Sequence, residues 1–127
     1  MQIHYSCPAS QLALICRSME NDLQYILVYV SCADKAEAEK IASAVLDERL
    51  AACANVVDGM ESMYWWKGKL EKARECILIF KSEQRLFERL NGKILDLHSY
   101  ETPCVVALPI IRGNRAYLDW ISASVTP

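Results

Sequence analysis

Apolar residues first gather into one long run and then spread out at helical spacing. The run from Leu23 to Cys32 is almost continuous and rich in β-branched and aromatic residues, which is typical of a strand covered on both faces. Asp34 stands three residues before Glu37, as in a capping box, and apolar residues then repeat at three and four positions as far as Leu50. The pattern predicts a buried strand followed by an amphipathic helix.

Three further extended segments follow, two of them joined by a tight turn. Ala54 to Val57 leads to a break at Asp58-Gly59, and another run extends from Met60 to Trp66. Lys67-Gly68 is a turn signal, and the strand that returns from it is predicted over Lys69 to Lys81. The pattern therefore predicts a long hairpin.

A second helix is predicted after the hairpin. Ser82 can serve as its N-cap, and apolar residues repeat at three and four positions up to Leu97, although Gly92 weakens the pattern. His98 falls at the C-terminal end of this helix. Thr102-Pro103 then stops any helix, because the residue before a proline disfavours helical geometry.

The last two elements complete the topology. Cys104 to Ile110 predicts a last buried strand, and Gly113-Asn114 introduces a short helix that carries Tyr117, Leu118 and Ile121. The order is β-α-β-β-α-β followed by α, which is the split βαβ arrangement of ferredoxin-like α+β domains. We therefore expect an antiparallel sheet with helices on one face.

The hairpin also predicts an oligomer. Trp65 and Trp66 are consecutive and must point to opposite faces, while Cys76 to Phe80 offers no polar residue to water. A chain this short cannot cover both faces of a sheet, and exposed apolar faces usually mark interfaces. We predict an obligate cyclic oligomer in which Tyr64, Trp65 and Trp66 lie at the subunit interface. The charged residues 71–75 are predicted to be the solvated part of the hairpin.

Composition narrows the class of protein. The chain has 127 residues with a net charge of −2, which suits one domain over residues 23–127 and disfavours nucleic acid as a partner. Residues 1–22 are predicted to form an irregular extension, because they lack the features of a signal peptide and no apolar run could cross a membrane. Six cysteines without a C-x-x-C pair suggest reduced, mostly buried thiols in a cytoplasm. They are Cys7, Cys16, Cys32, Cys53, Cys76 and Cys104.

His98 is the histidine that the predicted scaffold offers for chemistry. With Glu101 and a thiolate such as Cys32 it could bind zinc or copper. A histidine at a helix C-terminus also interacts favourably with the helix dipole without any ligand. We favour this structural role for His98 over metal binding. A nucleophile such as Ser99 or Cys104 would need to be held beside His98 by a third group. We therefore expect no enzyme.

Four motifs give the chain a resemblance to a known family. RLAACANV at residues 49–56, MYWWKGKLE at 63–71, HSYETPCVVALPI at 98–110 and GNRAYLDWI at 113–121 resemble the CutA divalent-cation-tolerance proteins in order and spacing. The resemblance covers residues 23–125. It implies a ferredoxin-like subunit, a tight homotrimer with long intersubunit hairpins, a role in the response to metal ions, and no established reaction.

The resemblance also implies a weakened copper site. The positions of the family's ligating cysteine and first histidine fall on Val30 and Leu97, so that only His98 is carried over and Cys32 is displaced by two residues. It implies weak binding of Cu(II) or Zn(II), with no cofactor required. An alternative is a trimeric signalling or small-molecule-binding module similar to nitrogen-regulatory trimers, with Lys81 and Tyr100 in a cleft between subunits.

Overall fold

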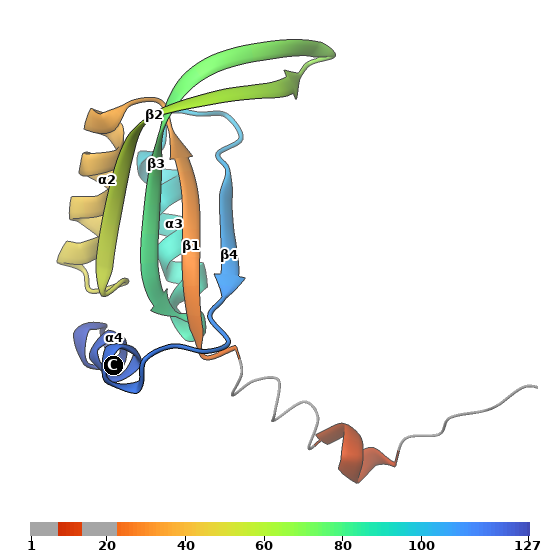
Figure 1. The fold of residues 1–127 in the computed structure, drawn as a ribbon, viewed down its shortest axis with the longest axis vertical. Coiled ribbons are helices and arrows are strands. Elements are labelled where there is room, and N and C mark those ends of the chain that lie inside the picture. Colours follow the sequence, from red (N-terminus) through yellow and green to blue (C-terminus); the bar gives the residue numbers. More distant parts are fainter. Residues whose placement is uncertain (1–7, 14–22) are drawn as a thin grey trace, which may run out of the picture.

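The fold is a four-stranded antiparallel sheet with helices on one face, as predicted. The computed structural model describes residues 8–13 and 23–127. The strand order is β2-β3-β1-β4, and α2 and α3 lie against the same side of the sheet (Figure 1). The elements are β1 (Tyr25–Cys32), α2 (Lys35–Asp47), β2 (Cys53–Trp66), β3 (Lys69–Glu83), η1 (Gln84–Leu86), α3 (Phe87–Leu97), β4 (Val105–Pro109) and α4 (Arg115–Ser124).

Alternation along the strands separates the core from an uncovered face. Val28, Val30 and Cys32 of β1 point toward the helices and are fully buried, whereas the intervening Leu27 and Tyr29 are only partly buried. The helix-facing residues form one continuous cluster with the apolar stripes of α2 and α3. The sheet thus has a closed apolar side and a second apolar side that one chain leaves open.

The predicted break at Asp58-Gly59 is wrong, because β2 continues through it. The pairing of β2 with β3 shifts register between Val57 and Met60, which is a β-bulge, and Gly59 takes a positive φ of 82° that suits a residue without a side chain. A bulge bends the strand while keeping it in the sheet. Beyond this point the hairpin arches over the end of the sheet (Figure 1).

The predicted cap at Ser82 is also wrong. Strand β3 continues to Glu83, because its pairing with β1 extends as far as Tyr25. Ser82 is fully buried, and its hydroxyl donates to the carbonyl of Leu50 at 2.6 Å. The second helix, α3, begins at Phe87 after the short turn η1, and its N-cap residue makes no side-chain hydrogen bond. Sheet pairing therefore outweighs the local capping preference.

The C-terminal part confirms one prediction and corrects another. The Asn114 side chain accepts from the N–H of Ala116 at 3.0 Å and so caps α4, as expected. The strand predicted over Cys104 to Ile110 is shorter and not buried, since Val106 and Leu108 are 47% and 50% exposed. Among the described residues, strand β4 forms an edge of the sheet beside β1. Val106 and Leu108 lie opposite Tyr29 and Leu27 on the open face, which explains their exposure.

The predicted extension over residues 1–22 lies largely outside the described residues, although residues 9–13 form a short helix. Within the described ranges, no helix has the length and apolar character needed to cross a bilayer. Cys32, Cys53, Cys76 and Cys104 are free thiols, and Cys7 and Cys16 lie outside the described residues. Cys32 and Cys76 are buried as predicted, whereas Cys53 is half-buried and Cys104 is exposed.

Ser82→Ala should lower the free energy of unfolding by about 1–3 kcal/mol, because the buried Leu50 carbonyl loses its partner. Ser82→Asp should cost more, since it places a carboxylate in the core; at a helix N-cap, aspartate would instead be tolerated. Urea denaturation at a fixed protein concentration measures both, with exposed Ser43→Ala as control. Equal stability of Ser82→Asp and wild type would contradict the strand position.

Candidate functional site

Three elements meet where β1 ends, α2 begins and α3 ends. Each contributes one side chain: Cys32 is the last residue of β1, Glu37 lies in the first turn of α2, and His98 follows directly after α3. The Cys32 sulfur, a Glu37 carboxylate oxygen and a His98 ring nitrogen lie within 4.8 Å of one another. Thiolate, carboxylate and imidazole are the ligand types that zinc and copper accept.

The His98 side chain is fully buried and bonded through both ring nitrogens. Its Nε2 lies 2.8 Å from the carbonyl oxygen of Ser31, and its Nδ1 accepts the backbone N–H of Tyr100 at 3.1 Å. An acceptor bond at Nδ1 places the proton of the neutral ring on Nε2. The backbone of His98 closes α3 by donating to Ile94, as predicted, but the ring ties this helix end to β1 instead of to helix carbonyls.

The carboxylate of Glu37 holds two backbone groups from distant parts of the chain. Oε2 accepts the N–H of Ala33 at 2.7 Å, and Oε1 accepts the N–H of Ser99 at 2.6 Å. Burial raises the pKa of Glu37, but the hydrogen bonds from Ser99 and Ala33 outweigh it, so that the pKa is lowered overall. The sequence offered Glu37 as a capping residue and gave no sign that it faces His98.

The Cys32 thiol is protonated at neutral pH. Burial, followed by the nearby carboxylate of Glu37, raises the pKa of Cys32 to about 12. A metal that bound here would have to displace this proton and disturb the hydrogen bond at His98 Nδ1. The lone pairs of Cys32, Glu37 and His98 are therefore poorly accessible to a metal ion.

The structure does not bring Glu101 to this group. Its side chain is 74% exposed, and its carboxylate lies 3.9 Å from the ammonium of Lys67 at the hairpin turn. Glu37 stands where a carboxylate ligand was expected from Glu101, because α2 and not the loop after α3 faces the ring. Both nitrogens of His98 bond to backbone groups, so the ring activates neither Ser99 nor Cys104.

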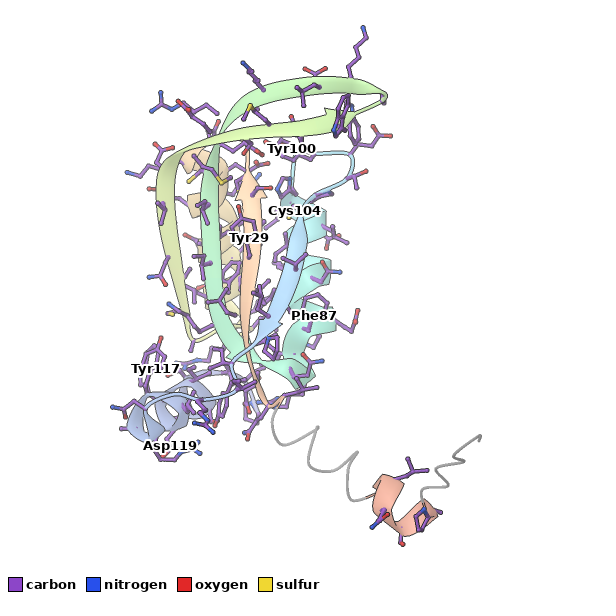
Figure 2. The ribbon with its side chains drawn as sticks, turned by 45° about the vertical axis from the view of Figure 1, so that its right-hand side comes forward. Tyr29, Phe87, Tyr100, Cys104, Tyr117 and Asp119 are labelled. Atoms are coloured by element: carbon purple, nitrogen blue, oxygen red, sulfur yellow. The ribbon has the colours of Figure 1, made fainter. Side chains whose placement is uncertain are left out.

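A cavity of about 770 Å³ lies on the open side of the sheet, beneath the arching hairpin. Tyr64, Trp66 and Tyr100 line it, whereas Trp65 is outside the lining and 75% exposed. Tyr29, Tyr100 and Cys104, which are labelled in Figure 2, also line this cavity. Lys81, which was predicted to share a cleft between subunits with Tyr100, is bonded to Asn55. Within one chain it lies six residues along β3 from Glu75, about 20 Å away.

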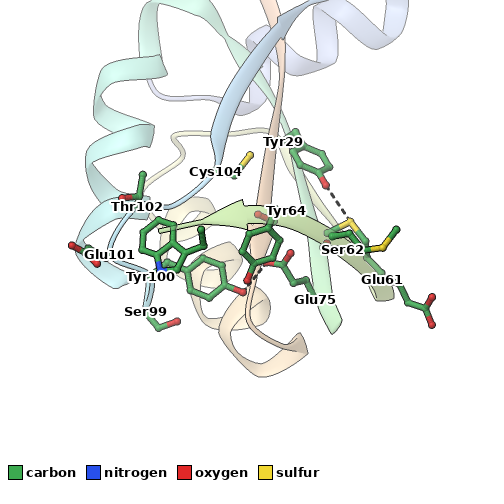
Figure 3. Close-up of a pocket in the computed structure, with 14 residues that line it drawn as sticks. Tyr29, Glu61, Ser62, Tyr64, Glu75, Ser99, Tyr100, Glu101, Thr102 and Cys104 are labelled. Atoms are coloured by element: carbon green, nitrogen blue, oxygen red, sulfur yellow. Dashed lines mark hydrogen bonds between the residues drawn. The ribbon is translucent and has the colours of Figure 1, made fainter. Parts of the chain in front are cut away.

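Glu75 is a candidate site residue that was not predicted from the sequence. It is 6% exposed, so the prediction that it is solvated is wrong. Its carboxylate accepts the hydroxyl of Tyr100 at 2.7 Å, as the dashed line in Figure 3 shows. Burial and this bond raise the pKa of Tyr100. One sign that Glu75 could be buried was present in the sequence, because it directly precedes the apolar run of β3. The loop that carries Tyr100 and covers Glu75 comes from a distant part of the chain, so the sequence did not indicate this contact.

Comparisons with known proteins point in one direction. The profile of the family described as "CutA1 divalent ion tolerance protein" matches residues 26–124. "Protein CutA 1, chloroplastic" of Oryza sativa subsp. japonica is 41% identical over 99 residues, which are 78% of this chain and 56% of that protein. "Divalent-cation tolerance protein CutA" of Archaeoglobus fulgidus is 40% identical over 98 residues, which are 77% of this chain and 95% of that protein.

Solved structures agree with the sequence comparisons. The crystal structure of CutA1 from Oryza sativa superposes with a TM-score of 0.79 at 39% identity, covering 82% of this chain and 95% of that one. The chain thus spans almost all of the archaeal relative but little more than half of the chloroplastic one.

Glu37→Gln should reduce the fall in the free energy of unfolding that occurs as the pH is lowered. Folding lowers the pKa of Glu37. The ionised carboxylate therefore stabilises the folded state at every pH above the pKa of glutamate in the unfolded chain, which is about 4.3. This stabilisation is lost as the pH falls through the lower pKa that Glu37 has in the folded state. Urea unfolding between about pH 7 and pH 3 measures the slope. Exposed Glu39→Gln on the same helix should keep the wild-type slope, and equal slopes for both variants would refute the assignment.

Proposed function

The chain belongs to the CutA1 divalent ion tolerance family, and we propose that it serves divalent-metal tolerance by binding Cu(II) or Zn(II) weakly at Cys32, Glu37 and His98. The observation that carries the proposal is the approach of a thiol sulfur, a carboxylate oxygen and a ring nitrogen to within 4.8 Å of one another. These three groups are the donor types of zinc and copper sites. Glu37 replaces Glu101 in this ligand set.

Three features support weak rather than tight binding. Ligand atoms of a tetrahedral zinc site lie roughly 3.5 Å apart, so the group would have to contract. The thiol of Cys32, whose pKa is raised to about 12, must lose its proton. Val30 and Leu97, which stand at the positions of the family's other ligands, are apolar and pack in or against the core.

Calorimetric titration of Cu(II) and Zn(II) into the full chain tests the ligand set. Cys32→Ala should weaken binding by about tenfold or more, because it removes the one thiolate. Cys76→Ala is the matched control, since Cys76 pairs with Cys32 across the strands and is equally buried. Affinity should rise with pH by up to about tenfold per unit, since binding expels the thiol proton.

Two carboxylate variants complete the metal test. Glu37→Gln should weaken binding, and Glu101→Gln should leave it unchanged. The opposite result, or binding that Cys32→Ala does not alter, would place the metal elsewhere and reject this ligand set.

The proposed assembly is a homotrimer that covers the open face of the sheet. Met63, Trp65 and Leu70 on the hairpin are 71%, 75% and 56% exposed, and Val106 and Leu108 on β4 are also half exposed. An apolar surface of this kind usually marks an interface. Tyr64, Trp65 and Trp66 remain the residues proposed for the subunit contact.

Sedimentation at micromolar concentration should give the mass of three chains, and Trp65→Lys should shift the population toward monomer by placing a charge in the contact. Leu46→Lys on α2 is the control, since Leu46 is exposed on the helical side of the molecule. A monomeric wild type, or a trimer indifferent to Trp65→Lys, would contradict the proposed interface.

A cytoplasmic location and a non-enzymatic role belong to the same proposal. Cys32 and Cys76 are paired in register yet remain free thiols, which suits a reducing compartment. Both ring nitrogens of His98 are engaged by backbone groups, which disfavours a role as general base.

A second candidate function is a trimeric module that binds a small molecule. The cavity beneath the hairpin favours it, since about 770 Å³ is within the usual range of ligand pockets. Tyr100 lines this cavity, while Lys81 would have to reach it from another subunit.

A further inference from the structure

We propose that the cavity beneath the β2–β3 hairpin binds an organic cation, a molecule with an ammonium group and an apolar body. The inference rests on the second candidate function above and gives it a ligand class. The lining holds three carboxylates, those of Glu61, Glu75 and Glu101, and no lysine, arginine or histidine. The electrostatic potential inside such a cavity favours a positive occupant.

Glu75 is the strongest argument for a cation. It is 6% exposed and lines the cavity, and its carboxylate accepts the Tyr100 hydroxyl (Figure 3). Among the ion pairs of the described residues, none involves Glu75 or Glu61. A buried carboxylate is costly unless a cation compensates it, and a hydrogen bond from a neutral hydroxyl supplies no charge.

The cavity walls suit an ammonium group with an apolar body. Tyr29, Tyr64, Trp66 and Tyr100 supply aromatic surface, and Met60 and Met63 add thioethers. Aromatic faces attract ammonium ions through the ring quadrupole. The rim already holds one such ion, because the Lys67 ammonium lies 5.5 Å from the Trp66 ring centroid and 3.9 Å from the Glu101 carboxylate.

The spacing of the carboxylates favours an organic cation over a bare metal ion. Within the part of the chain that the structure describes, the one trio of ligand atoms close enough for a metal is Cys32, Glu37 and His98. Glu61, Glu75 and Glu101 do not form such a trio. A single ion could not reach all three, whereas a molecule several atoms long can meet carboxylates and aromatic rings together.

The proposal requires that the cavity stay open in the trimer. Tyr64 and Trp66 line the cavity and also belong to the proposed subunit contact. A neighbouring subunit must therefore roof the cavity without filling it. Binding is accordingly tested on the full chain in its native assembly.

The test titrates hexylammonium, 1-hexanol and hexanoate, which share one apolar chain, into the protein by calorimetry at neutral pH. Hexylammonium should bind with a Kd on the order of 1 mM or tighter. Hexanol should bind about tenfold more weakly and hexanoate more weakly still, since each lacks the positive charge. Equal binding of all three would refute the cation and leave a small-molecule cavity. Failure of all three would reject both.

Two pairs of variants locate the bound cation. Glu75→Gln should weaken hexylammonium binding about tenfold, although the amide oxygen of the new side chain can still accept the hydrogen bond from Tyr100. Its control is Glu71→Gln at an exposed position on the same strand, which should change the affinity less than about twofold. Trp66→Leu should weaken it about fivefold. Trp120→Leu on α4 is the control and should leave binding unchanged, since Trp120 is 44% exposed and lies outside the lining. Wild-type affinity in both Glu75→Gln and Trp66→Leu, with thermal unfolding showing each variant folded, would overturn the proposal.

Discussion

The carboxylate of Glu37 receives backbone N–H groups from residues more than sixty positions apart, Ala33 and Ser99. With the bond from His98 to the Ser31 carbonyl, it fastens the end of α3 to the end of β1 and the start of α2. Hydrogen bonds to a charged group contribute about 1.5–3 kcal/mol each. The position of the loop that follows α3 depends on this cluster, and through that loop so does the position of Tyr100.

Strand alternation divides the chemistry of the molecule between two sides of one sheet. Cys32 points to the helices and joins the buried trio with Glu37 and His98. Ser31, the preceding residue, lines the cavity on the other side. The loop residues Ser99 and Tyr100 touch both regions, since Ser99 bonds to Glu37 and Tyr100 bonds to Glu75.

The hairpin gives the open side its form. The bulge between Val57 and Met60 bends β2 without ending it, and the outer hairpin then arches over the end of the sheet (Figure 1). Tyr64 and Trp66 turn toward the resulting cavity, and Trp65 turns away from it. The two-residue period of the strand thus separates the side chains that line the cavity from the one that faces away from it.

Periodicity in the sequence determined the order of elements, the helix-covered sheet, the long hairpin and the cap at Asn114, because these follow from local hydrogen bonding and apolar spacing. It failed at Ser82, where pairing between β1 and β3 outweighed a local cap, and at β4, whose edge position no local pattern encodes. Cys32 and His98, which were named together from the sequence, do lie close to each other, but the carboxylate beside them is Glu37 and not Glu101. The burial of Glu75 was likewise found in the tertiary structure alone. Which acid faces a histidine or a tyrosine depends on contacts between segments far apart in the chain, and spacing along the sequence carries no information about those distances.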